Sequence, residues 1–329
     1  MYQTTHRSRS KHGLNAKAGR SMVLLSALLL STLLVTGQPQ AASDPEMLIA
    51  TPDKYYTSPV WSPQGNTIAF SASNYNGIWL ADADGSNIRL LTADEGAGFR
   101  FSWSPDGNHI LARTTGTENR RRFARIQVYD INTKGYDILQ DKSRNIQGLP
   151  LWTPEGSHAV YVFNGQPVLQ PVPGKKQETL PANTLVPYST GDKLFAWNLS
   201  TRSSHMVAEF SERFIFNLSP SPSGNRIAFQ VQGKGLFVAD MDGSNPMHLG
   251  FGEMAAWMPD EQFAVVSVVE DDGHTITGAE LFAVDMKTGQ SYPLTEHTNV
   301  IALNPNVSPC GKWVIFNDEK GVIYKMALQ

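Results

Sequence analysis

Trp103-Ser104-Pro105-Asp106-Gly107-Asn108-His109-Ile110-Leu111-Ala112 is the stretch that decides the fold. It has the pattern of a strand end, a tight turn and then a buried apolar strand. Pro105 presets φ for the turn, Asp106 can hydrogen-bond its own backbone, and Gly107 supplies a positive φ. The stretch therefore predicts two consecutive strands joined by a short turn.

Variants of this turn recur along the chain. They are Trp61-Ser62-Pro63-Gln64-Gly65, Trp152-Thr153-Pro154-Glu155-Gly156, Ser221-Pro222-Ser223-Gly224, Trp257-Met258-Pro259-Asp260 and Ser308-Pro309-Cys310-Gly311. The successive turn prolines are separated by 42, 49, 68, 37 and 50 residues. A period of about 40–50 residues is that of a β-propeller blade. We therefore predict an all-β fold, a six-bladed β-propeller, with seven blades as the alternative.

The two ends of the chain are predicted to meet in one blade. The last repeat has candidate strands at 312–316 and 321–326 but none at its outer edge, whereas Met47–Ala50 is an apolar strand without a neighbour. We predict that Met47–Ala50 supplies the missing outer strand and closes the ring, because closure removes exposed strand edges. Tryptophans recur at one position of the repeat, which predicts packing between blades; they are Trp61, Trp103, Trp152 and Trp257.

The number of blades depends on the irregular repeat that begins at Trp152. Beyond its first strands the sequence offers two candidate hairpins and a weaker further strand, namely 168–170 with 178–180, 194–199 with 205–208, and 184–187. Strands alternate in direction, so an insertion must add an even number of them. Two extra strands fit a hairpin inserted into a six-bladed ring, whereas a seventh blade would need four. Six blades are favoured on this ground.

Residues 1–42 are predicted to be a secretory signal peptide. The apolar run Met22–Val35 follows several basic residues and precedes the small residues Gly37, Ala41, Ala42 and Ser43. This run is shorter than the ~20 residues of a membrane-spanning helix, although an uncleaved anchor stays an alternative. We therefore expect a periplasmic or secreted chain, with a lead-in over residues 43–57 and a propeller domain over residues 58–329.

Composition limits the classes of function. The 329-residue chain has a formal net charge of −3, which gives no basic field for nucleic acid, and its 41% of hydrophobic residues suit a large core. The single cysteine, Cys310, cannot form an intramolecular disulfide. We predict a monomer that binds no nucleic acid and is stabilised by its core and by closure of the ring.

The repeat over Pro59–Thr92 has the pattern Pro-x-Trp-Ser-Pro-x-Gly-x-x-Ile-Ala-Phe, then Ile-Trp-x-x-Asp-x-Asp-Gly, then Arg-Leu-Leu-Thr. It resembles the WD40-like repeats of the TolB family of periplasmic β-propellers, from Ser58 to the C-terminus and least between Gln166 and Ser219. The resemblance implies a six-bladed propeller that binds envelope proteins, such as a peptidoglycan-associated lipoprotein. Similar repeats occur in oligopeptidases, tricorn-like proteins and some pectate-degrading lyases. The family also has an α/β domain before its propeller, and residues 42–57 are too few to form one, which leaves a Tol-type role open.

We predict no enzyme activity, no catalytic residues, no metal site and no cofactor. The sequence has no Gly-x-Ser-x-Gly nucleophile elbow. His109 and His158 share one repeat position and are interpreted as polar residues beside a turn. The turns at Asp82–Gly85 and Asp240–Gly243 lack the remaining ligands of an EF-hand calcium loop. The alternative is a secreted propeller enzyme, such as a metal-dependent polysaccharide lyase.

Two long connections between second and third strands form the predicted binding surface. Connections of this kind share one face of a propeller, and binding residues favour loops on a rigid scaffold. The connection over residues 113–124 is basic, and the one over residues 270–278 is acidic. The candidate binding residues are Arg113, Arg120, Arg121, Arg122, Arg125, Glu270, Asp271, Asp272 and His274.

We predict that this face binds an envelope protein or lipoprotein without chemistry. The opposite charges would steer association and fix its register more than they would add affinity. Two solvated insertions without a partner are the alternative, and the acidic cluster around His274 could also hold a cation.

Overall fold

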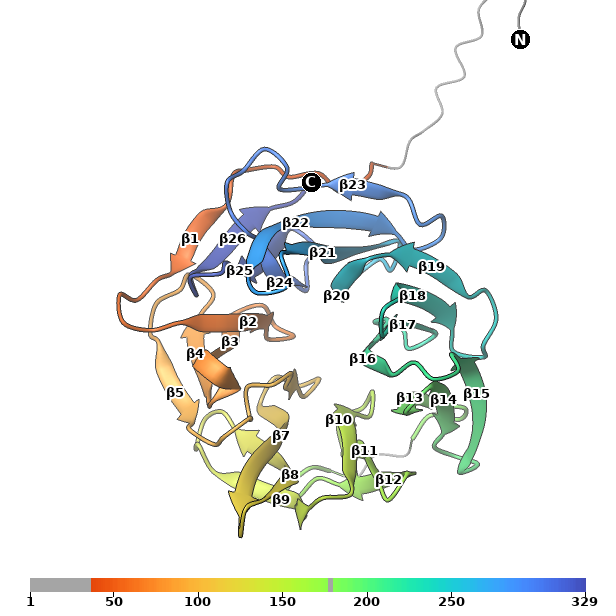
Figure 1. Ribbon diagram of the computed structural model, residues 1–329. Helices are drawn as coiled ribbons and strands as arrows, with labels where there is room; N and C mark the ends of the chain where they lie inside the picture. The colour runs from red at the N-terminus through yellow and green to blue at the C-terminus, as the bar shows by residue number, and fades with distance from the viewer. Residues whose placement is uncertain (1–36, 177–179) are drawn as a thin grey trace, which may run out of the picture. The chain divides into compact units, whose positions relative to one another are not determined.

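The computed structural model describes residues 37–176 and 180–329, and these residues form a β-propeller. Seven antiparallel sheets, or blades, follow one another in a ring (Figure 1). Residues of the innermost strands line a cavity of about 350 Å³ at the centre, which we call the channel. We name the blades A to G in the order of their first strands. The described residues contain one short helical segment, the 3-10 turn η1 (Ser73–Tyr75).

The strands of each blade are given from the channel outward. Blade A has β2 (Tyr56–Trp61), β3 (Thr67–Ala72), β4 (Ile78–Asp82) and β5 (Arg89–Thr92). Blade B has β6 (Ser102–Trp103), β7 (His109–Glu118), β8 (Arg121–Asp130) and β9 (Tyr136–Ser143). Blade C has β10 (Ile146–Trp152), β11 (His158–Phe163) and β12 (Gln166–Pro171). Blade D has β13 (Leu185–Thr190), β14 (Lys193–Asn198) and β15 (Ser203–Glu209).

The remaining blades have four strands each. Blade E has β16 (Ile215–Pro220), β17 (Arg226–Val231), β18 (Gly235–Asp240) and β19 (Met247–Gly250). Blade F has β20 (Gly252–Trp257), β21 (Phe263–Asp271), β22 (Ile276–Asp285) and β23 (Ser291–Pro293). Blade G has β24 (Leu303–Val307), β25 (Trp313–Asn317), β26 (Ile323–Ala327) and β1 (Glu46–Ile49).

The core lies between the blades rather than in one central mass. Each seam between two blades holds its own cluster of buried apolar side chains, as where Ile78 and Leu80 of blade A meet Ile110 and Ala112 of blade B. The middle strands are buried on both faces, as in β17, where every residue after Arg226 is buried. This burial follows because each sheet is covered on both sides by its neighbours. The ring is therefore held together by all seven seams.

The prediction of six blades is wrong, and the seven-bladed alternative is correct. The irregular region contains six strands, β10 to β15, which is also the number that a four-stranded blade with an inserted hairpin would have. The structure divides these strands into two three-stranded blades, C and D. The region therefore adds an even number of strands, as predicted, but the expectation that a seventh blade needs four extra strands is wrong: two suffice, because blades C and D have three strands each. The predicted strand 178–180 falls largely outside the described residues.

Blade D lacks a counterpart of the innermost strand. Its strands β14 and β15 repeat the register of β18 and β19: Leu194 opposite Ala208 matches Leu236 opposite Gly250, and in both blades the register shifts after this pair, at Leu194/Phe195 and Leu236/Phe237 respectively. By this register β14 and β15 are third and fourth strands, so β13 corresponds to a second strand. A blade without a first strand also has no Ser-Pro-x-Gly turn, because that turn joins the first strand to the second.

The N-terminal strand closes the ring, as predicted from the sequence. Strand β1 pairs antiparallel with β26, with Met47 opposite Tyr324, and forms the outer strand of blade G. Upstream of β1, the N–H of Gln40 donates to the carbonyl of Gln329 at 3.0 Å. Most of the predicted signal peptide lies outside the described residues. Within the described residues, no helix has the length and apolar character needed to cross a membrane.

Tryptophans of the inner strands connect neighbouring blades, in agreement with their recurrence in the sequence. The indole Nε1–H of three of them donates to a carbonyl on the preceding blade: Trp103 to Val60 (3.3 Å), Trp152 to Ser102 (3.2 Å) and Trp257 to Ser219 (2.9 Å). Trp61 differs, because its buried Nε1 has no hydrogen-bond partner among the described residues. The tryptophans thus combine apolar packing with a polar link between blades.

This difference allows a matched test of the link. We expect Trp257→Phe to lower the free energy of unfolding by about 2–3 kcal/mol, because it removes packed ring atoms and a hydrogen bond. Trp61→Phe removes an N–H without a partner, so its loss should be smaller by about 1 kcal/mol. Chemical denaturation of both variants measures the two losses. Equal losses would mean that the Trp257 hydrogen bond adds nothing to the packing.

Candidate binding surface

The basic connection is a hairpin arm of two paired strands. Strands β7 and β8 pair without interruption from His109 opposite Asp130 to Glu118 opposite Arg121. Only Asn119 and Arg120 form the turn, with φ of 51° and 63°. Positive φ at both central residues is the turn geometry that suits the twist of paired strands. The expectation of a long loop over residues 113–124 is therefore wrong, because these residues are paired strands apart from the turn.

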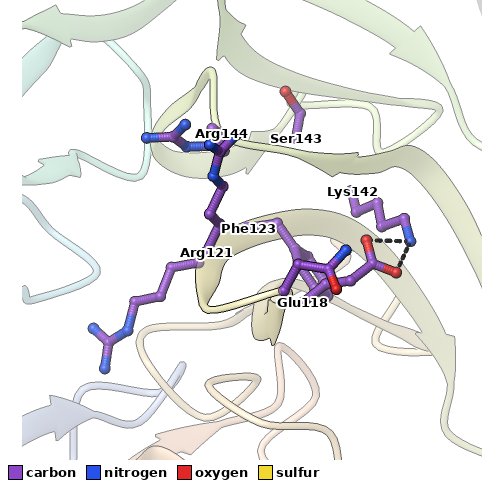
Figure 2. A pocket seen from close by; sticks show the side chains of 8 residues that line it. Glu118, Arg121, Phe123, Lys142, Ser143 and Arg144 are labelled. Atoms are coloured by element: carbon purple, nitrogen blue, oxygen red, sulfur yellow. Dashed lines mark hydrogen bonds and ion pairs between the residues drawn. The ribbon is translucent and has the colours of Figure 1, made fainter.

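Basic side chains gather at the tip of this arm (Figure 2). Arg121 and Arg122 line an open cavity of about 620 Å³ together with Lys142 and Arg144. Lys142 Nζ lies 2.7 and 2.8 Å from the two carboxylate oxygens of Glu118, so these charges neutralise each other. Among the described residues, Arg121, Arg122 and Arg144 form no ion pair, so the tip keeps a positive charge.

Two of these cationic residues were not found from the sequence. Lys142 lies near the end of the outer strand β9 and Arg144 follows it, and β9 pairs with β8 and so runs beside the arm. The basic run Lys142-Ser143-Arg144 was a visible signal. It could be placed beside Arg121 only once the pairing of the outer strand was known.

Arg113 and Arg125 do not belong to the tip. Arg125 Nε lies 2.9 Å from Asp141 Oδ1, which neutralises its charge within the blade. Arg113 lies at the base of the arm and donates from Nη1 to the carbonyl of Gly148 at 3.3 Å. The structure therefore brings together Arg120, Arg121 and Arg122 and separates them from Arg113 and Arg125.

The acidic connection is also a hairpin arm, formed by β21 and β22. Asp271 stands opposite Ile276, and residues 272–275 form the exposed tip. Asp272 Oδ1 accepts the N–H of Thr275 at 2.8 Å and that of His274 at 2.9 Å, and these hydrogen bonds hold the pKa of Asp272 below its ordinary value. Glu270 and His274 are exposed beside it.

The two arms stand on one face of the ring, at different points of its rim. Each arm joins the second and third strands of its blade, B for the basic arm and F for the acidic arm, so both emerge at the same end of the channel. Blades A and G separate them on one side, and blades C, D and E on the other (Figure 1). This hairpin face therefore presents opposite charges across the channel mouth.

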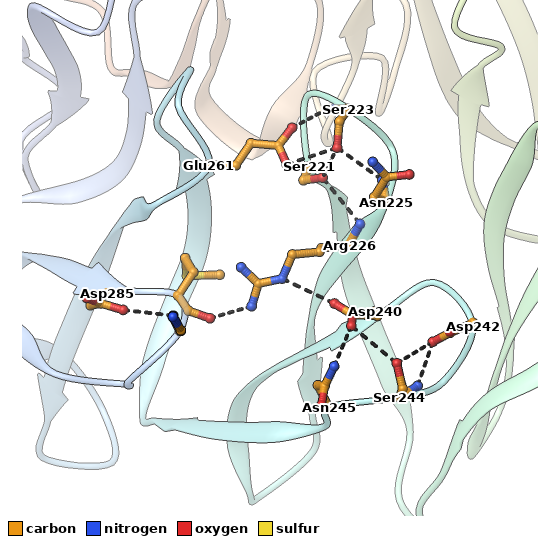
Figure 3. A network of polar contacts seen from close by, with 12 residues as sticks. Ser221, Ser223, Asn225, Arg226, Asp240, Asp242, Ser244, Asn245, Glu261 and Asp285 are labelled. Atoms are coloured by element: carbon orange, nitrogen blue, oxygen red, sulfur yellow. Dashed lines mark hydrogen bonds and ion pairs between the residues drawn. The ribbon is translucent and has the colours of Figure 1, made fainter.

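The opposite face consists of short turns whose polar groups bond to one another. Figure 3 shows the network between blades E and F, in which Arg226 Nε lies 3.5 Å from Asp240 Oδ1 and Ser223 Oγ donates to Glu261 Oε2 at 2.9 Å. In the Asp-x-Asp-Gly turn, Ser244 Oγ donates to Asp242 Oδ1 at 2.6 Å. These carboxylates stabilise the turn and the seam between blades.

The histidines after the first turns bond within their own blades. His109 Nε2 lies 3.9 Å from Asp130 Oδ2, and His158 Nδ1 lies 2.8 Å from Ser157 Oγ. Burial is the main cause that lowers the pKa of His109 below its ordinary value. Residues 37–176 and 180–329 contain no group of three or more His, Cys, Asp or Glu side chains arranged to hold a metal ion.

Comparison with known proteins supports the fold. No protein-family model and no curated protein matches the sequence. Among solved structures, the β-propeller domain of Cps50 (Swd1) from Myceliophteria thermophila matches with a TM-score of 0.58 and 15% identity, over 86% of this chain and 99% of that one. A protein described as a TolB from Agrobacterium tumefaciens matches with a TM-score of 0.54 and 14% identity, over 86% of this chain and 93% of that one. These likenesses show the β-propeller fold.

Two further solved structures match less closely. TolB from Acinetobacter baumannii has a TM-score of 0.47 and 16% identity, over 83% of this chain, and the chain spans 63% of the length of that TolB. An oligogalacturonate lyase in complex with manganese has a TM-score of 0.48 and 13% identity, over 88% of this chain and 95% of that one. Neither likeness distinguishes a binding protein from an enzyme.

Proposed function

We propose that this protein is an exported, TolB-like propeller that binds another protein of the cell envelope through its hairpin face, without catalysis. The observation that carries the proposal is the pair of oppositely charged arms on one face. Both arms are hairpins of paired strands, so their backbones are ordered before a partner arrives, and a preorganised surface loses less conformational entropy on binding. Export rests on the predicted signal peptide, and the envelope partner rests on the resemblance to TolB repeats.

The arms also suggest the character of the partner. A partner that meets both arms would carry an acidic patch for Arg121 and Arg122 and a basic patch for Glu270 and Asp271. Complementary charges raise the association rate and reject partners of the wrong polarity, and both effects weaken as salt screens the charges. We therefore propose a salt-sensitive complex that forms with one orientation.

The test is crosslinking capture from envelope extract of the source organism with the double variant Arg121→Glu, Arg122→Glu. We expect at least a tenfold loss of the captured partner, because repulsion replaces attraction at the basic tip. Arg120 is left unchanged, because its φ is 63° and a substitution there would also change the conformational energy of the turn.

The matched control is Lys287→Glu, Lys312→Glu, which makes the same charge change at exposed residues beside short turns of the opposite face. Capture by this control should equal that of the wild type. Equal capture by both double variants would remove the hairpin face from the proposal, and equal loss in both would show an effect of net charge alone.

A further inference from the structure

A cavity of about 760 Å³ opens from the channel between blades B, C, D and E. Its walls include β10 of blade C, β13 of blade D and β16 of blade E. Because blade D has no counterpart of the innermost strand, the space that such a strand would fill stays open. The seam between blades C and D also has the smallest core cluster, with the buried residues Val160, Val186, Trp197 and Leu199. A cavity of this size lies within the usual range of ligand sites, ~300–1,000 Å³.

Aromatic side chains keep much of their surface free in this cavity. Phe99 is 44% exposed, Phe214 is 64% exposed and Phe216 is 41% exposed, and all three line the cavity. Tyr188 lines it as well and stacks on Phe195, with ring centroids 5.3 Å apart. Concave surfaces lined by aromatic rings suit the apolar part of a small ligand.

The charge of the cavity is wholly positive. Arg100 and Arg113 are its only charged lining residues, and neither forms an ion pair in the part of the chain that the structure describes. Arg100 Nη1 lies 2.8 Å from Met254 Sδ on blade F, so its guanidinium crosses the channel. Burial lowers the pKa of Arg100 to about 10 and also lowers the pKa of Arg113, and both stay charged at neutral pH.

The backbone conformation at this crossing belongs to the fold. Arg100 has φ of 54° and Met254 has φ of 57°, and Ser58, Asn217 and Asn304 have similar values at the matching position of their inner strands. The inner strands have a register irregularity at this position, as between Glu253 and Ala256, so the positive φ marks a recurring bulge.

Two buried hydrogen-bonding atoms at this cavity have no protein partner. They are Nε of Arg113 and Oγ of Ser102, which lie on residues that line the cavity. A buried donor without a partner costs about 1–3 kcal/mol. An anionic oxygen accepts from both an Arg N–H and a Ser O–H, and the hydrogen bond is stronger when one partner is charged.

We propose that this cavity binds a small amphipathic anion, a carboxylate joined to an apolar body of aromatic size. The carboxylate accepts hydrogen bonds from Arg113 and Ser102, and Arg100 adds its positive charge. The apolar body lies against Phe214 and Phe216. The site shares only Arg113 with the residues predicted from the sequence, and it does not depend on the proposed partner at the hairpin tips.

Isothermal titration calorimetry of the full propeller with 2-naphthylacetate tests the proposal. We expect 2-naphthylacetate to bind, and 2-naphthylacetamide, which has the same body without the charge, to bind at least tenfold more weakly. Arg113→Gln should lose at least tenfold in affinity for the acid, because a charge-assisted hydrogen bond is lost. The matched control Arg89→Gln, on the outer strand of blade A and away from the cavity, should bind the acid like the wild type.

One further variant and one further ligand complete the test. Ser102→Ala should lose about threefold to tenfold in affinity for the acid, as expected for one hydrogen bond. This variant provides the test if Arg113→Gln does not fold. N-acetyl-Gly-Phe binding more tightly than naphthylacetate would identify a peptide C-terminus as the source of the carboxylate, and weaker binding would identify a free small molecule. The proposal is overturned if the acid does not bind, if acid and amide bind equally, or if both cavity variants bind like the wild type.

Discussion

Replacing Ile49 by glutamate should lower the free energy of unfolding by about 3–5 kcal/mol, since the change removes buried apolar surface and places a carboxylate in the core. Ile49 is 2% exposed and packs with Tyr56, Ile68 and Ile315, at the seam between blades G and A. Unfolding free energies of domains are ~5–15 kcal/mol, so this one substitution should remove a large share of the stability. Chemical denaturation followed by tryptophan fluorescence measures the loss.

Met47 provides the matched control on the same strand. Met47 is 71% exposed, and the register irregularity between Met47 and Ile49 turns the two side chains to different surroundings. Met47→Glu should change the free energy of unfolding by no more than about 0.5 kcal/mol, as is usual for surface positions. If Ile49→Glu were as stable as Met47→Glu, strand β1 would not close the ring in solution.

Replacing Asn317 by leucine should lower the free energy of unfolding by about 2–4 kcal/mol. Asn317 is fully buried at the end of β25, and its Oδ1 accepts the N–H of Ser58 at 3.0 Å and the side-chain N–H of Asn304 at 3.0 Å. Leucine has nearly the same volume but leaves these donors unpaired, at about 1–3 kcal/mol for each one that stays buried. Because Ser58 belongs to blade A and Asn317 to blade G, this bond joins the two ends of the ring.

The same change at an exposed asparagine separates this effect from a loss of polarity. Asn108 is exposed in the turn between β6 and β7, and Asn108→Leu should stay within about 0.5 kcal/mol of the wild type. Thermal and urea unfolding of the two variants compare them directly. Similar stability of Asn317→Leu and Asn108→Leu would show that the seam does not depend on this hydrogen bond.

Stability and binding can be separated in these experiments. The Ile49 and Asn317 variants act on the seam between blades G and A, whereas the basic arm belongs to blade B and the cavity lies between blades B and E. Variants at the exposed Arg121 and Arg122 should therefore keep the unfolding midpoint of the wild type, and the Arg113 variant is used for binding once its unfolding midpoint has been measured. A binding loss in these variants then reports on the surface or the cavity and not on folding.

The sequence by itself determined the features that depend on local chemistry. The Ser-Pro-x-Gly turns, their period and the short β-branched strands predicted a propeller, because turn geometry is set by a few adjacent residues. The recurring tryptophans predicted packing between blades, and three of them form the same inter-blade hydrogen bond. The sequence also predicted that Met47–Ala50 closes the ring, because the last repeat lacked an outer strand and the lead-in contained a strand without a neighbour.

Only the tertiary structure decided the number of blades and the composition of the sites. Counting turns gave six blades because blade D has no first strand and therefore no turn to count. The basic tip needs Arg144 beside Arg121, and the cavity needs Ser102 beside Arg113 and Phe216. These neighbours come from different strands or blades, and their approach is fixed by strand pairing and by the packing of whole blades. No local pattern in the chain encodes those long-range contacts.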